Sequence, residues 1–247
     1  MEHELRSFWR IFFEYNWKFA VFLTLLICVP RFILVLNANA SGNYSAIGLV
    51  MLASALAPIV FLTKTGRKNA GITKPKSYIG LLLAFIVGLA FSFLLYFAGY
   101  NLYGNTDMNW YQYIGRSYRI PAVISLNDKA VLFSVVAVTS MIFSPVGEEL
   151  FFRGIVHSGF AKSIGDKKAS AADSLIFAIV HISHFGIIYN NGHWDYLIAP
   201  GLIWFLAMFL ISLLFFLFRR YTGSILGSIA CHAAFNLGMT YCIFYLL

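Results

Sequence analysis

The chain has 247 residues, of which 60% are hydrophobic and only 11% are charged. A soluble domain of this length cannot bury so much apolar surface, so the composition excludes a soluble globular protein and indicates an integral membrane protein. The formal net charge of +8 does not indicate nucleic-acid binding, because the basic residues lie in short loops between apolar runs, where they mark membrane topology.

Apolar runs recur along the whole chain, and crossing about 30 Å of hydrocarbon takes roughly 20 helical residues. They predict an all-α membrane protein of about seven transmembrane helices, with residues 1–247 forming a single polytopic domain. The predicted spans are residues 17–36, 46–63, 78–99, 129–150, 174–189, 198–218 and 224–246. The aromatic and basic segment before the first span predicts an interfacial amphipathic stretch.

The Lys and Arg residues predict the orientation, because cytoplasmic loops of membrane proteins carry an excess of them. They gather at one end of alternate spans, at Arg6, Arg10, Lys18, Lys64, Arg67, Lys68, Lys74, Lys76, Lys162, Lys167, Lys168, Arg219 and Arg220. Segment 100–128, on the other side, holds only Arg116 and Arg119. We therefore expect a cytoplasmic N-terminus and an outward-facing C-terminus.

Ionisable side chains inside the predicted spans are functional candidates, because they are costly to place in hydrocarbon. Arg31 follows Pro30 near the predicted outer end of the first span, so we expect it to reach the interface. The remaining polar candidates are Glu148, Glu149, Arg153, His181, His184, His232 and Asn236. His184 is the weaker of the two histidines on the fifth span and is assigned at most a supporting role.

Glu149 and Arg153 are four residues apart, which on a helix favours an ion pair along one face. Glu148 is then left free, and a free carboxylate in a partly dehydrated site suits a general base that takes a proton from water. The alternative is a helix end at the interface, with solvated carboxylates and an arginine that reaches toward the headgroups.

His181 follows Phe177 by one helical turn, and His232 precedes Asn236 by one turn. On their predicted spans both histidines lie in the cytoplasmic half of the membrane, so one pocket there can collect them with Glu148. Two histidines, an amide and a carboxylate can activate water and stabilise an oxyanion. The same residues can instead hold a divalent metal, with His181 and His232 as ligands and Glu148 as ligand or base.

Three motifs resemble those of the CAAX protease and bacteriocin-processing family of intramembrane peptidases. Ser-Pro-Val-Gly-Glu-Glu-Leu-Phe-Phe-Arg-Gly (144–154) contains the family's Glu-Glu-x-x-x-Arg, Phe-Ala-Ile-Val-His (177–181) its Phe-x-x-x-His, and His-Ala-Ala-Phe-Asn (232–236) its His-x-x-x-Asn. The motifs stand in the family's order, each on its own predicted span, and the resemblance covers about residues 125–245.

The resemblance implies a helical fold of seven or eight spans in a bacterial cell membrane, with a pocket that opens toward the cytoplasm. It implies that Glu148 activates water and that Glu149 and Arg153 brace the motif. His181, His232 and Asn236 would bind the water, the oxyanion or a metal such as zinc. Eukaryotic relatives cleave prenylated CAAX proteins, and small bacterial-looking members are associated with bacteriocin self-immunity and with processing of peptide pheromones.

The sequence therefore predicts an endopeptidase that acts on a membrane-associated peptide or protein within the lipid bilayer. The alternative is a bacteriocin-immunity or adaptor protein that binds a peptide in the same cavity without turnover. A transporter is less well supported, because no pair of interrupted spans recurs in matching halves of the chain.

Overall fold

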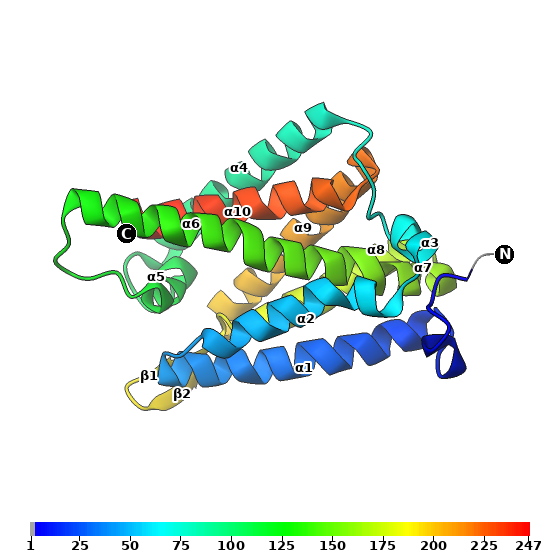
Figure 1. The fold of residues 1–247 in the computed structure, drawn as a ribbon. Helices are drawn as coiled ribbons and strands as arrows, with labels where there is room; N and C mark the ends of the chain where they lie inside the picture. Colours follow the sequence, from blue (N-terminus) through cyan, green and yellow to red (C-terminus); the bar gives the residue numbers. More distant parts are fainter. Residues whose placement is uncertain (1–2) are drawn as a thin grey trace.

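The computed structural model describes residues 3–247, which form a bundle of long helices and one β-hairpin (Figure 1). The helices are η1 (Trp9–Ile11), α1 (Trp17–Ser41), α2 (Ser45–Phe61), α3 (Lys64–Asn69), α4 (Tyr78–Tyr103), α5 (Trp110–Gly115), η2 (Arg116–Tyr118), α6 (Leu126–Glu149), the π-helical η3 (Leu150–Val156), α7 (His157–Ile164), α8 (Asp166–His181), α9 (Ile198–Thr222) and α10 (Ile225–Tyr245). The antiparallel strands β1 (Ile187–Asn190) and β2 (His193–Tyr196) pair with Ile187 opposite Tyr196.

Polar caps mark where several of the apolar helices begin. The side chains of Asn16, Ser77, Ser125 and Ser224 each accept a backbone N–H in the first turn of α1, α4, α6 and α10. These bonds satisfy donors that have no partner inside a helix, and serine and asparagine are favoured in this position.

Within residues 3–247, four helical stretches are long and apolar enough to cross a membrane. They are α1, α4, the continuous stretch from α6 through α7, and α9, while α2 is a shorter apolar helix. The chain is thus a nearly all-helical integral membrane protein. Each of the seven predicted spans overlaps a helix, but the number of membrane crossings and the orientation stay predictions.

The predicted boundaries of the fourth and fifth spans are wrong. The fifth span was expected at residues 174–189, but α8 runs from Asp166 to His181 and the chain then turns into β1. The apolar run continues past this turn, which is why composition did not reveal it. Gly186 permits the turn because its φ is 118°, a conformation that other residues rarely adopt. Its lack of a side chain also lets it pack against Gly201 of α9. The fourth helical stretch also continues beyond residue 150, through η3 and α7 to Ile164.

Small residues bring α10 close to α4. A Cβ atom at Gly88 would overlap the backbone carbonyl of Cys231, and one at Gly238 would overlap the hydroxyl of Ser92. Close backbone approach at small residues is a common way for membrane helices to pack. Since Cys231 precedes His232, this contact also sets the position of a predicted site residue.

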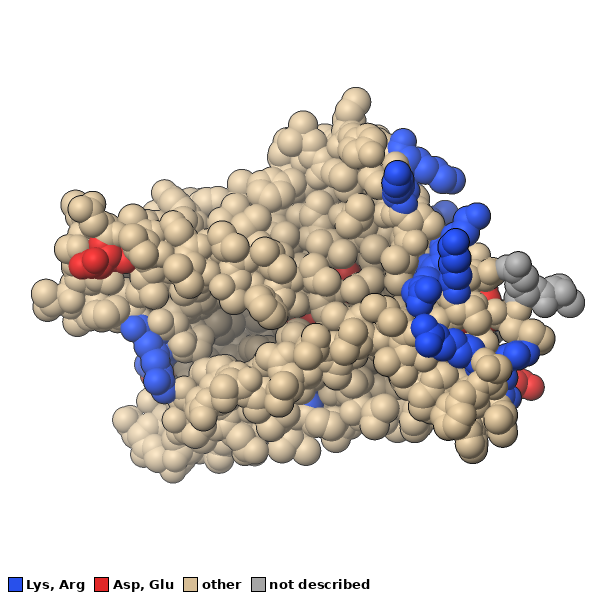
Figure 2. Space-filling view, in the orientation of Figure 1, with Lys and Arg blue, Asp and Glu red and all other residues tan. Residues whose placement is uncertain are grey.

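Most of the 18 Lys and Arg side chains lie at one end of the helices, which we call the basic end (Figure 2, right). It comprises the residues before α1, the segment around α3, and the α7–α8 and α9–α10 turns. The other end, which we call the opposite end, carries α5, η2 and the hairpin (Figure 1, left). Its basic residues are Arg116, Arg119 and Lys129.

Gly88→Ala should destabilise the protein by about 1–3 kcal/mol, because the added methyl group forces α4 and α10 apart. Gly48→Ala on α2 is the matched control, since nothing lies within 4 Å of a Cβ atom built there. It should leave stability unchanged or raise it slightly, as alanine favours helices. Thermal unfolding in detergent measures both variants, and equal melting temperatures would contradict the close packing.

Candidate active site

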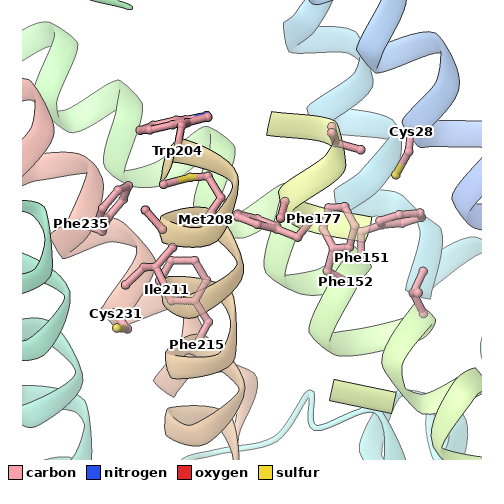
Figure 3. Close-up of a cluster of buried hydrophobic side chains, with 14 of the residues drawn as sticks. Cys28, Phe151, Phe152, Phe177, Trp204, Met208, Ile211, Phe215, Cys231 and Phe235 are labelled. Carbon is pink, nitrogen blue, oxygen red and sulfur yellow. The ribbon is translucent and has the colours of Figure 1, made fainter. Parts of the chain in front are cut away.

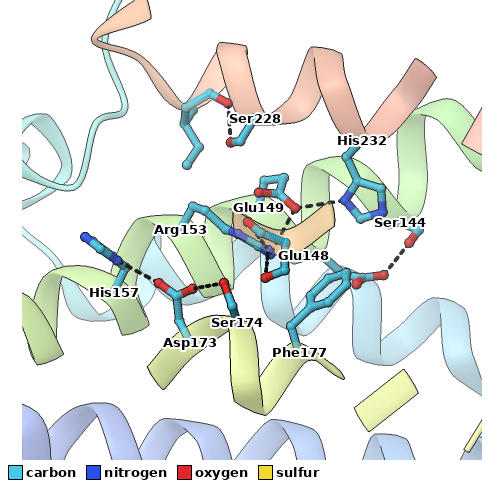
Figure 4. A network of polar contacts seen from close by, with 12 residues as sticks. Ser144, Glu148, Glu149, Arg153, His157, Asp173, Ser174, Phe177, Ser228 and His232 are labelled. Atoms are coloured by element: carbon cyan, nitrogen blue, oxygen red, sulfur yellow. Dashed lines mark hydrogen bonds and ion pairs between the residues drawn. The ribbon is translucent and has the colours of Figure 1, made fainter. Parts of the chain in front are cut away.

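Glu148 and Glu149 lie at the end of α6, inside the protein. They are 2% and 0% exposed, respectively, and η3 begins directly after them (Figure 4). Gly147 holds this end of α6 against α2, because a Cβ atom there would lie 2.7 Å from the carbonyl oxygen of Met51. π-Helical turns inside α-helices are frequent at functional sites. The local backbone thus places both carboxylates away from water and lipid.

Arg153 pairs with Glu149, as the four-residue spacing predicts. Nη1 of Arg153 lies 3.2 Å from Oε1 of Glu149, and Nη2 donates to the hydroxyl and carbonyl oxygens of Ser212 on α9. Nδ1 of His232 on α10 lies 2.8 Å from the same Oε1 of Glu149. The guanidinium also lies 4.6 Å from the centroid of the Phe177 ring, within range for a cation–π interaction. This pair therefore holds α6 and η3 against α8, α9 and α10.

Glu148 has a partner that the sequence analysis missed. Arg31 of α1 is 4% exposed, and its Nη2 lies 3.0 Å from Oε1 of Glu148. The expectations that Arg31 reaches the interface and that Glu148 is unpaired are therefore wrong. The first span was ended too early: α1 continues to Ser41, so Arg31 lies about 15 Å inside that end of the helix.

The two carboxylate oxygens of Glu148 differ in their hydrogen-bond partners. Ser144, one turn earlier, donates its hydroxyl to Oε1, whereas Oε2 has no hydrogen-bond partner and lies 3.7 Å from Nε2 of His181. Nδ1 of His181 lies 2.7 Å from the carbonyl oxygen of Phe177, so Nδ1 carries the proton and Nε2 of the neutral ring has a lone pair. Two acceptors therefore face each other across this gap.

His232 and Asn236 reach the site from α10. The ring of His232 stacks on Phe215, with the ring centroids 4.5 Å apart. Nδ2 of Asn236 donates to the carbonyl oxygen of Ser140 on α6 at 3.0 Å, which leaves its second N–H available. The one-turn spacing read from the sequence thus places both side chains on one helix face.

A cavity of about 640 Å³ lies in front of these groups. Glu148, His181, His232 and Asn236 all line it, together with Arg31 and the weaker candidate His184. The remaining walls are mainly apolar side chains from α2, α5, α6, α9 and α10. Figure 2 shows the surface hollowed between α6 and α2, and the hollow widens toward the opposite end.

Aromatic side chains of η3, α8 and α9 are buried beside the site (Figure 3). Phe151 and Phe152 are 1% exposed and Phe215 is 0% exposed. The rings of Phe152 and Phe177 are 5.4 Å apart in an edge-to-face arrangement. Phe151 and Phe152 follow the glutamates on η3, whereas Phe177 and Phe215 form part of the cavity wall.

A second polar chain joins α7 to α8, and its members His157 and Asp173 are buried (Figure 4), whereas its third member, Asp166, is exposed. Nδ1 of His157 lies 2.6 Å from Oδ2 of Asp173, and Nε2 lies 3.0 Å from Oδ1 of Asp166. Burial raises the pKa of Asp166, but the hydrogen bond and charge of His157 and the charges of Arg219 and Arg220 together lower it below its ordinary value. None of the three chain members lines the cavity, so we assign this chain a structural role.

The described side chains do not form the metal site that the sequence left open. Within residues 3–247, no group of three or more His, Cys, Asp or Glu side chains is arranged to hold a metal ion. Glu148 is already paired with Arg31, whose charge repels a cation. The set Glu148, His181 and His232 therefore does not fit a zinc site, which needs at least three converging ligands.

Glu148→Gln should destabilise the protein by about 3–5 kcal/mol, because it leaves the buried charge of Arg31 without a partner. The double variant Glu148→Gln/Arg31→Met removes both charges and should recover most of this loss. Thermal unfolding of the single and double variants in detergent measures the difference. A double variant no more stable than Glu148→Gln would contradict the ion pair.

A family model matches residues 130–238 of the chain, and its description is Type II CAAX prenyl endopeptidase Rce1-like. None of the curated proteins and none of the solved structures matches. All three sequence motifs lie inside the matched range, whereas Arg31 lies outside it. The resemblance inferred from the motifs is confirmed over residues 130–238, where this integral membrane protein is similar to the Rce1-like type II CAAX prenyl endopeptidases, a family of proteases.

Proposed function

We propose that the protein is an intramembrane endopeptidase that hydrolyses a peptide bond in a membrane-associated peptide or protein, with Glu148 as the general base. The observation that carries this proposal is the unpartnered Oε2 of Glu148, which lies 3.7 Å from Nε2 of His181 at the wall of a mainly apolar cavity. The match of residues 130–238 to a protease family supports peptidase activity. The water-activating glutamate and the substrate are the parts that we propose.

The two facing acceptors suit a water molecule, because water can donate one hydrogen bond to each. In the proposed reaction Oε2 of Glu148 takes a proton from this water, and the hydroxide oxygen bonds to the carbonyl carbon of the substrate. The carbonyl oxygen becomes an oxyanion. Glu148 then returns the proton to the amide nitrogen, and the C–N bond breaks to give a carboxyl group and an amine.

Asn236 and His232 are placed to stabilise the oxyanion. Asn236 uses one N–H for Ser140 and has a second for the substrate. Nδ1 of His232 donates to Glu149, and a proton on Nε2 would let this ring donate toward the cavity. Donors that are fixed before the reaction stabilise developing negative charge without reorganisation. Arg153 acts through Glu149, which it holds in place for this contact.

The cavity favours an apolar substrate segment. Apart from the polar groups at its inner end, its walls come mainly from Ile, Val, Met and Phe side chains. The substrate classes that remain open are prenylated CAAX-type proteins, pheromones and bacteriocin-like peptides. We place the reacting groups nearer the cytoplasmic ends of their helices, since His232 is seven residues, about 10 Å, from the start of α10 at Ile225.

Glu148→Gln and His232→Ala should each lower substrate cleavage by about 100-fold or more, because each removes a group that contacts the reacting atoms. The measurement compares membrane and secreted peptides, by mass spectrometry, between cells with the unsubstituted protein and cells with each variant. This comparison also identifies the substrate. Glu14→Gln and His193→Ala, at exposed positions, are the matched controls and should cleave normally.

The double variant Glu148→Gln/Arg31→Met separates folding from chemistry, since it should be stable and inactive. Full cleavage by both Glu148→Gln and His232→Ala, at normal protein levels, would refute the proposed peptidase function. A host phenotype that survives Glu148→Gln but is lost when the cavity is filled would favour the immunity or adaptor function instead.

Chelators should not reduce cleavage, because the proposed reaction uses Glu148 without a metal. The test treats purified protein in proteoliposomes with EDTA or a phenanthroline, using a substrate peptide found in the comparison above. Loss of cleavage with the chelator, and its return with added zinc, would contradict the metal-free reaction.

A further inference from the structure

The cavity mouth and the basic surface lie at different ends of the protein. The cavity is lined by Tyr44 and Ser45, where α1 turns into α2, and by Ser117 and Tyr118 of η2. All four belong to the opposite end (Figure 1, left). The Lys and Arg side chains gather at the basic end (Figure 2, right). A path from solvent to Glu148 therefore starts far from the basic loops.

Toward the basic end, packed side chains of the described residues follow Glu148 and Glu149. The stretch after the glutamates is buried from Phe151 to Val156, with Arg153, Ile155 and Val156 each 0% exposed. Phe151 and Phe152 fill the space beside it. Access through this end would require this packing to come apart, whereas the hollow between α2 and α6 is already open.

The rim of the hollow is apolar and exposed. Val135 and Phe143 on α6 line the cavity and are 60% and 63% exposed. Large apolar side chains that face outward on membrane helices contact lipid. The mouth therefore borders both the lipid and the aqueous interface at the opposite end, where Ser45 and Ser117 lie.

Loops rich in Lys and Arg face the cytoplasm in membrane proteins, which makes the opposite end the outer one. We infer that the substrate enters from the non-cytoplasmic face, as an apolar peptide segment held in the outer leaflet or exported across the membrane. This inference rests on the proposed peptidase function, and it replaces the expectation of a pocket that opens toward the cytoplasm. The reacting groups can lie nearer the cytoplasmic side while the route to them starts outside.

Thiol labelling of intact cells tests the side on which the mouth lies. The native cysteines Cys28, Cys231 and Cys242 are buried, so the unsubstituted protein gives the background. Ser45→Cys at the mouth should react with a membrane-impermeant sulfonated maleimide in intact cells. Lys68→Cys at the basic end should react only after the cells are permeabilised.

Gly48→Cys tests whether this mouth is the route to the site. Gly48 lines the cavity, and nothing lies within 4 Å of a Cβ atom built there, so the thiol fits without disturbing α2. Labelling this variant from outside should reduce cleavage at least tenfold, because the bulky adduct fills the hollow. His193→Cys, on the exposed hairpin at the same end, should be labelled without loss of cleavage.

Two results would overturn the inference. One is reaction of Ser45→Cys only after permeabilisation. The other is labelling of Gly48→Cys from outside with unchanged cleavage. Neither result bears on hydrolysis, because the proposed function fails only if the Glu148→Gln and His232→Ala variants keep full activity. The two ideas can therefore fail separately.

Discussion

The site depends on two buried ion pairs, in each of which an arginine neutralises a glutamate inside an apolar protein. Arg31 pairs with Glu148 and Arg153 pairs with Glu149. An unpaired carboxylate in this position would be very unfavourable, so each glutamate requires a cation within contact distance. Each carboxylate keeps one oxygen without a hydrogen-bond partner. The adjacent acids nevertheless differ, because Glu149 is held by Arg153 and His232 and does not line the cavity, whereas Glu148 does.

Local sequence spacing predicted much of the site. The pair Glu149 and Arg153 and the shared face of His232 and Asn236 follow from helical geometry over four residues, and the structure contains both. Arg31 could not be paired in this way, because 117 residues separate it from Glu148. A signal was present, since an arginine inside an apolar run is costly unless it has a partner. The error in the end of the first span hid that signal.

The helices were predictable from apolarity, but their ends were not. α8 begins with a polar stretch at Asp166, which the hydropathy pattern excluded, and it ends where Gly186 allows a turn within a continuing apolar run. The direction of the cavity was also beyond sequence reasoning. It depends on which end of the bundle is filled by aromatic side chains such as Phe151 and Phe152, and on the gap that α2 and α6 leave. Counting residues from the basic loops predicted how far along their helices the site residues lie. It could not predict at which end of the bundle the cavity opens.

The central claim is that Glu148 acts as a base on water and does not attack the substrate itself. A single turnover in water labelled with a heavy oxygen isotope tests this most directly, with enzyme in excess over a peptide substrate. The account predicts that the new carboxyl group of the product carries the label after the first turnover and that Glu148 remains unlabelled. Label in the side chain of Glu148, together with an unlabelled first product, would instead indicate a covalent intermediate on that carboxylate and contradict the account.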